Sequence, residues 1–341
     1  MRAKDIAKNL GISAASVSLV MNNKPGVSDA TRAKVLKAIQ ETQYGMGIKK
    51  VSSDKTVLFL VHRNIELDES RVPYFSQVFE QVMIGIESGA KQEQCKVVIQ
   101  YIDNISIQKF VEDQVPANID GIVLLGTEIR QKYVQMLLKL DIPIILMDNY
   151  MYNLPIHCVV INNEQGVQLA INHFIEKGHA SIGYVHVADN ANNFQERYFG
   201  FMRSMQQWKL EIEPTHIVFL KSDSNQTLYQ QVLEKLSGIC SLPTAFFADN
   251  DIVAIEAYKA LTQLGYTVGE DISIIGFDDI AYSQIMNPPL TTIKSPQYAM
   301  GKVAVNMLMR QVENSLLGIQ KVEIMTSVVS RQSVKQRRRL C

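Results

Sequence analysis

The larger part of this 341-residue chain alternates between two kinds of segment. Short apolar runs of strand length are followed by longer stretches in which apolar residues recur at helical spacing. Uninterrupted apolar runs are typical of strands buried on both faces, so the pattern predicts parallel sheets covered by helices. Two open, doubly wound lobes of α/β class fit best, and a closed barrel is the alternative. The apolar runs are 56–61, 97–99, 121–126, 142–147, 182–185, 217–220, 244–248 and 272–277, and the helical stretches are 74–94, 128–140, 164–177, 196–208, 226–237 and 251–264.

The first 45 residues follow a different pattern, made of short helices. Residues 3–10 place apolar side chains on one helical face, and Gly11 ends that helix. Ser13 is placed to cap a second helix over 14–21, and Ser28 a third helix after it. Because helices this short need a shared core, they predict either a DNA-binding helix-turn-helix or an ordinary helical subdomain. The candidate contacts to phosphates or bases are Ser13, Ser16 and Ser18.

Charge is divided unevenly between these two parts. Residues 1–55 hold 10 Lys and Arg against 4 Asp and Glu, a net charge of +6. Because the whole chain has a net charge of zero, the remainder carries −6. A basic head on an acidic body suggests a nucleic-acid-binding module, and a solvated basic face is the plainer alternative.

Several classes of protein are disfavoured by what the sequence lacks. The N-terminus has no apolar signal segment, and no run approaches the ~18–20 apolar residues of a membrane span. The four cysteines are scattered, as reduced thiols are, so we expect a cytoplasmic protein without membrane contact. Phosphate-loop, dinucleotide, nucleophile-elbow and Cys-x-x-Cys motifs are missing, and the six histidines lack metal-ligand spacing. We therefore expect no enzyme, no cofactor and no metal.

Polar residues follow several of the apolar runs. Ligands of doubly wound sheets bind beyond the carboxyl ends of the strands, where these residues would lie. Carboxylate and amide acceptors there suit a ligand with several hydroxyl groups, and Arg197 would add a forked donor at the start of its helix. For the carboxylates, a helix cap is the alternative, and for Asp251 it is equally favoured. The acceptors are Asp148, Asn250, Asp251 and Asp278.

The head resembles the DNA-binding headpiece of the lac-repressor family of bacterial transcription regulators. The matching residues are Asp5-Ile6-Ala7, Gly11-Ile12-Ser13, Ser16-Val17-Ser18, Val20-Met21-Asn22, Val27-Ser28 and Thr31-Arg32. The resemblance implies a homodimeric repressor that binds a palindromic operator. The DNA-contacting residues it implies or allows are Lys4, Ser13, Ala14, Ala15, Ser16, Ser18, Leu19, Asn22, Asn23, Ser28, Lys49 and Lys50.

The body resembles the effector domain of the same family, whose fold is related to periplasmic sugar-binding proteins. The matching segments are Asp148, Gly178-His179, Arg197-Tyr198-Phe199-Gly200-Phe201, Asn250-Asp251 and Gly276-Phe277-Asp278-Asp279. The resemblance implies a small effector, in the first place a carbohydrate, bound between two lobes. The effector contacts it suggests are Tyr74, Phe75, Asp148, Asn193, Arg197, Asn250, Asp251 and Asp278, with core packing as the alternative for the aromatic pair.

The same resemblance implies a chain that crosses between lobes more than once. We expect crossings near residues 160, 290 and 325. The expected divisions are a headpiece at 1–46, a linker at 47–55, a first lobe at 56–160 plus 290–325, a second lobe at 161–289 plus 326–335 and a basic tail at 336–341.

The sequence departs from the family pattern at the DNA-binding end. Ala14, Ala15 and Leu19 stand where relatives often have longer polar residues, and the linker with Gly45 and Gly47 disfavours a helix. Two alternative effectors remain open, a phosphorylated carrier protein and a purine. A doubly wound enzyme and a plain sugar carrier are the rival functions, and the headpiece opposes both.

Overall fold

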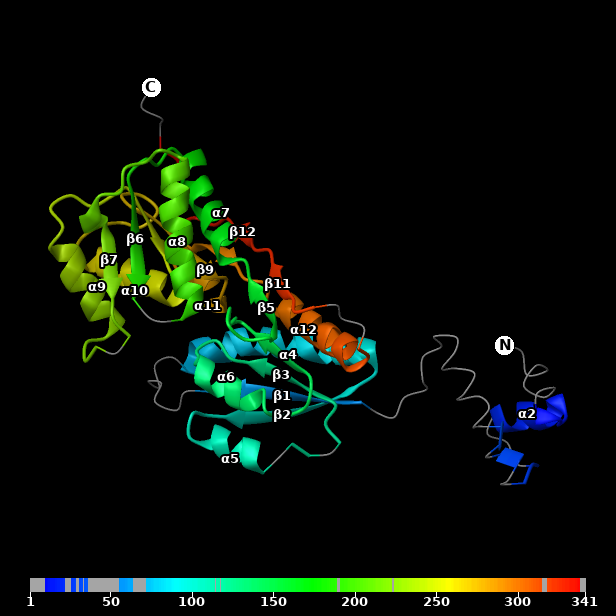
Figure 1. Ribbon diagram of the computed structural model, residues 1–341. Coiled ribbons are helices and arrows are strands. Elements are labelled where there is room, and N and C mark those ends of the chain that lie inside the picture. The colour runs from blue at the N-terminus through cyan, green and yellow to red at the C-terminus, as the bar shows by residue number, and fades with distance from the viewer. Residues whose placement is uncertain are drawn as a thin grey trace. The chain divides into compact units, whose positions relative to one another are not determined.

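A computed structural model gives the three-dimensional structure, and Figure 1 draws it as a ribbon. The chain divides into two units, Met1–Ser53 and Asp54–Cys341, and each is described by itself. The described residues are 10–21, 26–28, 31–32, 34–35, 55–63, 72–113, 115–116, 118–188, 191–222, 224–314 and 318–337. Within these segments, only the backbone is described at 14–15, 18, 21 and 72–78.

The N-terminal unit contains the second predicted helix, α2 (Ala14–Met21). Ser13 caps it, since its hydroxyl accepts a 3.0 Å hydrogen bond from the Ser16 amide. Ser28 does the same for the Thr31 amide at 3.3 Å, at the start of the next helical backbone. A small apolar core joins these elements, as the sequence predicts for helices too short to be stable alone. Its members are Val17, Val20 and Val35, with Leu10, Ile12 and Val27 partly buried against them.

The first lobe of the larger unit is a six-stranded parallel sheet. Residues of alternate parity along β1 pack against helices on opposite faces, so the sheet is buried on both sides. The strand order is β2 (Lys96–Ile102), β1 (Thr56–His62), β3 (Gly121–Leu125), β4 (Ile144–Met147), β5 (His157–Ile161) and β11 (Lys321–Ile324), and the helices are α4 (Val72–Glu93), α5 (Ser106–Glu112), α6 (Gln131–Leu137) and α12 (Gln297–Val312).

The second lobe repeats the same winding with a second six-stranded sheet, in which only the last strand is antiparallel. Figure 1 shows its helices on both sides of the strands. The order is β7 (Ile217–Leu220), β6 (Ile182–Val187), β8 (Ala245–Ala248), β9 (Ser273–Asp278), β10 (Thr291–Lys294) and β12 (Ser327–Val329), and the helices are α7 (Asn163–Glu176), α8 (Asn192–Gln207), η2 (Pro214–His216), α9 (Leu228–Ser237), α10 (Asp251–Gln263) and α11 (Ala281–Ile285).

Two open sheets replace the barrel alternative, so the predicted fold class of two doubly wound lobes is confirmed. The chain crosses between sheets after β5, between β10 and α12, and between β11 and β12. The expected boundary near residue 290 is wrong, because β10 still pairs with β9 and the crossing falls at Ser295 and Pro296. No helix in the described part of the chain combines the length and apolar character that crossing a bilayer takes.

Helices α4 and α12 pack against each other at a crossing that requires glycine. A Cβ atom added to Gly301 would lie 2.5 Å from the carbonyl oxygen of Val82, and one added to Gly85 would lie 2.1 Å from that of Tyr298. Real Cβ atoms do not approach a carbonyl oxygen so closely, so both positions exclude a side chain. The crossing holds the returning helix α12 on the first lobe.

Candidate functional site

Three acidic residues lie where strands of the two sheets end. Asp148 follows β4 in the first lobe, while Asp249 follows β8 and Asp278 ends β9 in the second lobe. Asp148 and Asp278 have φ angles of 62° and 105°, in the left-handed region that non-glycine residues rarely adopt. Such a conformation costs on the order of 1–3 kcal/mol, and it is found most often at functional sites. The carboxyl ends of both sheets therefore bring acceptors to one polar cluster.

Arg197 is the cation of this cluster, and its side chain is buried. The sequence predicts Arg197 at the start of its helix. Helix α8 begins at Asn192, however, so Arg197 lies in the second turn. Nε donates to Asn163 Oδ1 at 2.9 Å and Nη1 to the Asp249 carbonyl at 2.6 Å. Nη2 donates to Asp278 at 3.4 Å, and the guanidinium lies 3.8 Å from the centre of the Phe277 ring. Each guanidinium nitrogen thus bonds to a group of the second lobe, and the Phe277 ring lies against the guanidinium.

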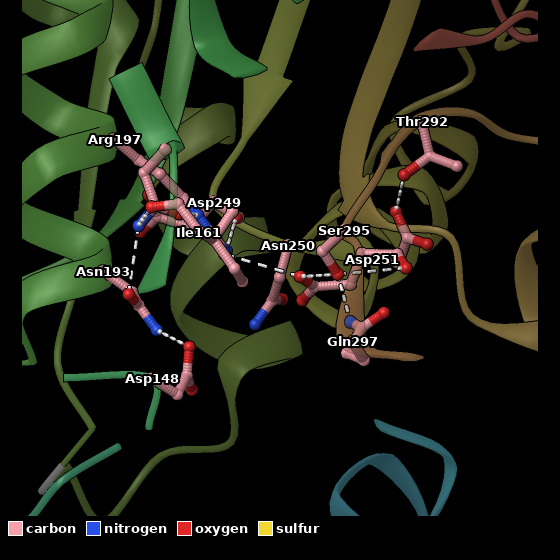
Figure 2. Close-up of polar contacts among 12 residues, drawn as sticks. Asp148, Ile161, Asn193, Arg197, Asp249, Asn250, Asp251, Thr292, Ser295 and Gln297 are labelled. Atoms are coloured by element: carbon pink, nitrogen blue, oxygen red, sulfur yellow. Dashed lines mark hydrogen bonds and ion pairs between the residues drawn. The ribbon is translucent and has the colours of Figure 1, made fainter. Parts of the chain in front are cut away.

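Asp148 brings the first lobe to the same cluster. Its two carboxylate oxygens accept hydrogen bonds of 2.6 Å from Thr127 Oγ1 and 3.1 Å from Asn193 Nδ2. Burial raises the pKa of Asp148 to about 6, although both hydrogen bonds act in the opposite direction. Figure 2 shows Asn193 reaching from the second lobe to this carboxylate.

Asn250 and Asp251 have different surroundings from each other. Asn250 is the N-cap of α10, and its side-chain oxygen accepts a 2.9 Å bond from the Val253 amide. Asp251 has no solvent exposure, and it accepts bonds from Ile280 N, Ser283 Oγ and Thr292 Oγ1. Burial raises the pKa of Asp251 to about 7. Its oxygens hold α10, α11 and β10 together, so Asp251 does not cap its own helix, which was the alternative considered for it.

Further contacts join the two lobes beside the cluster. Asn192 Nδ2 donates to Asn149 Oδ1 at 2.7 Å and to the Tyr150 carbonyl at 3.0 Å. Lys321 of β11 lies 3.6 Å from a Glu196 oxygen and 3.8 Å from the centre of the Tyr150 ring. The first two turns of α8 therefore contact both the loop after β4 and the last strand of the first sheet.

Sequence reasoning missed one central residue, Asn163. It begins α7 directly after the crossing from β5, and it is 1 % exposed. Its amide contacts Asn193, Glu196 and Arg197. The available signal was a polar Asn162-Asn163 pair after the apolar run 159–161, but that run was not predicted as a strand.

Other predicted site residues are only partly covered by the described structure. Tyr74 and Phe75 lie on the helical backbone of α4, with their side chains outside the description, as are those of Ala14, Ala15 and Ser18 on α2. Lys4, Asn22, Asn23, Lys49 and Lys50 lie outside the described residues altogether. Leu19 is partly exposed and is not a member of the headpiece core.

The described residues show no gathering of three His, Cys, Asp or Glu side chains of the kind a metal ion needs. The polar cluster instead combines one arginine with carboxylate and amide groups. Such a set can accept from and donate to the neutral polar groups of a small molecule.

Comparisons with known proteins agree with this organisation. Residues 3–45 match the model of bacterial regulatory proteins of the lacI family, and residues 171–334 match the periplasmic binding protein-like domain. The "HTH-type transcriptional repressor PurR" of Haemophilus influenzae is 30% identical over 343 residues, covering 97% of this chain and 98% of that protein. The protein of the same name from Aliivibrio salmonicida is 30% identical over 338 residues, with the same coverage.

Solved structures with the same fold include a transcriptional regulator CelR–cellobiose complex, with a TM-score of 0.71 and 21% identity over 97% of this chain and 99% of that one. The lac repressor dimer bound to operator and the anti-inducer ONPF has a TM-score of 0.69 and 23% identity over 97% and 98%. A helix-turn-helix head joined to a two-lobed domain defines a class of ligand-controlled DNA-binding regulators. The chain belongs to the LacI family of bacterial regulatory proteins within that class. It is a DNA-binding transcription regulator with a small-molecule effector domain.

Proposed function

We propose that this regulator is a cytoplasmic repressor that binds a palindromic operator as a homodimer, and that a small carbohydrate held between its lobes controls operator affinity. The observation that carries the effector proposal is the polar cluster itself. Arg197 is fixed by Asn163, Asp249 and Asp278 of one lobe, while Asp148 of the other lobe contacts the same group through Asn193. Asp148, Arg197, Asn250 and Asp278 are the residues we assign to the effector.

The chemistry of these four side chains suits a ligand with several hydroxyl groups. Each hydroxyl can donate to a carboxylate and accept from a guanidinium at the same time. Charge-assisted hydrogen bonds of this kind contribute about 1.5–3 kcal/mol each when buried. We leave Asp251 out of the assignment because its oxygens bind three groups of its own lobe. Tyr74 and Phe75 remain proposed apolar contacts.

Homodimer formation is supported by the exposed apolar surface of β2. Val98, Ile99 and Tyr101 on this edge strand are 46%, 43% and 51% exposed. An exposed edge strand with apolar side chains is prone to associate with another chain unless it is covered. If the β2 surface of a second copy packs against this one, both apolar surfaces are covered and two headpieces can bind one palindrome.

DNA binding is proposed for the headpiece residues named from the sequence. Ser13 and Ser16 stand at the first turn of α2, where hydroxyl groups can contact phosphates or base edges. Leu19 lies farther along the same helix and remains partly exposed, as a base-contacting side chain must be. The basic residues Lys4, Lys49 and Lys50 supply charge for phosphate contacts.

The experiment that tests the proposal has two parts. The purified chain is screened by thermal unfolding against sugars and nucleobases, since a specific ligand at 100 times its Kd stabilises by about 2.7 kcal/mol. An operator is then selected from a randomised duplex library, and binding is measured at several salt concentrations with and without the ligand found. Salt-independent binding, or equal affinity after removal of residues 1–50, would contradict the DNA part. No stabilisation by any small molecule would contradict the effector part.

A purine is the second candidate effector. It is favoured by the relatives that match over nearly the full length, which are the repressors named PurR. The screen separates the two classes, because the same panel contains both sugars and purine bases. Response only to a phosphorylated carrier protein would support the remaining alternative.

A further inference from the structure

Asn163 has a buried side chain beside the proposed effector site, and it bonds to three side chains of one helix. Its Oδ1 accepts the 2.9 Å bond from Arg197 Nε. Its Nδ2 donates to Glu196 Oε2 at 2.7 Å and to Asn193 Oδ1 at 3.0 Å. The same nitrogen lies 3.5 Å from the Ile161 carbonyl oxygen, at the limit of a hydrogen bond, so the two shorter bonds to α8 occupy its two hydrogens. One buried amide group therefore contacts three side chains of α8.

Each of those three side chains also contacts a different part of the molecule. Arg197 donates hydrogen bonds to Asp249 and Asp278 at the ends of β8 and β9. Asn193 donates to Asp148 in the first lobe, through the 3.1 Å bond that Figure 2 shows. Glu196 forms an ion pair with Lys321 of β11, whose ammonium also lies over the Tyr150 ring.

Asn163 lies where the chain passes from the first lobe to the second. It is the second residue after β5, at the first crossing between lobes. The neighbouring Asn162 backbone donates 2.9 Å to Ile324 at the end of β11, next to the third crossing. A shift in the contacts of Arg197 or Asp148 therefore reaches the first crossing through the Asn163 side chain, and the third crossing through the adjacent backbone of Asn162.

We propose that Asn163 is a positioning residue that couples the effector-binding side chains Arg197 and Asp148 to the segments where the chain crosses between the lobes. This inference rests on the effector site proposed above. Buried hydrogen-bond networks of this kind are strongly coupled, because an unsatisfied member in a low-dielectric interior is costly. Loss of the amide donor should loosen the contact between the lobes while each lobe stays folded.

The variant that tests this role is Asn163→Asp. The new carboxylate keeps the acceptor for Arg197, but it removes every bond that the amide nitrogen donates and places a like charge against Glu196. The matched control is Asn162→Asp one residue earlier, because Asn162 is the N-cap of α7 and accepts from the Gln165 amide, as a carboxylate also can. This control loses only the 3.7 Å contact of its amide nitrogen with Met325 Sδ, a weak acceptor. A second variant adds Glu196→Gln to Asn163→Asp, which removes the repulsion and supplies an amide donor in its place.

Backbone hydrogen exchange of the full chain, with no small molecule added, is the primary measurement. In Asn163→Asp we expect exchange at least tenfold faster in the segments around 148–152 and 320–325, which are remote from residue 163 in sequence. Asn162→Asp should leave both segments within twofold of the parent, and the double variant should return them to within about threefold. Acceleration confined to 159–166, uniform acceleration across both lobes, or no recovery in the double variant would each overturn the coupling role.

A second measurement separates this inference from the proposed function. D-ribose, cellobiose and adenine are tested for their effect on binding of the parent to its selected operator. If one of them acts, Asn163→Asp should bind it within about threefold of the parent, yet keep less than a tenth of the fold change in operator affinity. A full operator response in the variant overturns the coupling role. If none acts on the parent, none of the three compounds is its effector, and the exchange measurement still decides whether Asn163 couples the lobes.

Discussion

Asn193 of α8 donates a 3.1 Å hydrogen bond to the carboxylate of Asp148, which follows β4 in the other lobe. The bond joins a helix of the second sheet to a strand end of the first. Asn192 beside it bonds to Asn149 and to the Tyr150 carbonyl, so two consecutive amides hold the same loop. The relative position of the lobes is therefore set partly by hydrogen bonds within the proposed effector site.

Replacing Arg197 should affect both stability and effector binding. Arg197→Ala removes the cation beside Asp278 in a buried site, and breaking a buried ion pair costs about 3–5 kcal/mol. Denaturant unfolding measures this loss, and calorimetry should then show no binding of the effector found by screening. Arg203→Ala on the same helix is the control, because its ion pair with Glu164 is exposed and should contribute less than about 1 kcal/mol. Equal effects of the two substitutions would contradict the assignment.

His179 should make the protein less stable in acid. Its ring bonds to Thr244, Ser273 and the Lys335 carbonyl, and burial lowers its pKa to about 4. The folded state thus favours the neutral ring, so stability is fully present above about pH 6.5 and falls as the pH drops toward 4. The loss should approach roughly 3 kcal/mol near pH 4. Unfolding of the parent and of His179→Gln across this range isolates it, since the other titrating groups are common to both, and parallel profiles would refute it.

The crossing of α4 and α12 should tolerate no side chain at Gly301. Gly301→Ala places a methyl group against the backbone of α4 and should lower the free energy of unfolding by about 1–3 kcal/mol. Gly238→Ala is the matched control, since the nearest atom to its added Cβ is 3.6 Å away. Thermal unfolding of both variants compares them, and an unchanged midpoint for Gly301→Ala would show that the helices can separate without cost.

The exposed face of β2 should determine the oligomeric state. Ile99→Asp adds a charge to the proposed dimer surface and should convert the protein to a monomer, as measured by light scattering. Operator affinity should fall with it, because one headpiece contacts only half a palindrome. Phe219→Asp is the control, since Phe219 is 44% exposed on the edge strand of the other sheet. A monomeric parent, or a dimer that survives Ile99→Asp, contradicts this surface.

Leu19 should contribute to the choice of operator sequence. Leucine cannot donate a hydrogen bond, but it can pack against the methyl group of thymine, whereas arginine pairs with guanine O6 and N7. Leu19→Arg should therefore shift the preference at one base pair of each half-site toward guanine by about 1–3 kcal/mol. Selection from a randomised operator with both proteins measures the shift. Identical selected sequences would mean that Leu19 packs within the headpiece and contacts no base.

Most local elements can be read from the order of residues alone, because periodicity and capping are properties of neighbouring residues. All eight predicted apolar runs are strands in the structure, and the caps at Ser13 and Ser28 form as expected. Four strands were not predicted: β5, β10, β11 and β12. β10 and β12 carry polar residues such as Thr291 and Ser327, and their place in a sheet depends on pairing with distant strands.

The contacts of each polar residue after a strand depend instead on how the elements pack. Asp148 and Asp251 both follow apolar runs, yet one bonds across to the other lobe and the other bonds only within its own. That difference arises from packing between elements far apart in the chain, which no local pattern encodes. The contacts of Asn163 likewise could not be predicted from local patterns, since its three partners on α8 lie 30 to 34 residues away along the chain. Its role could be seen only after α7 and α8 were placed side by side, because a hydrogen bond depends on distance in space and not on distance in sequence.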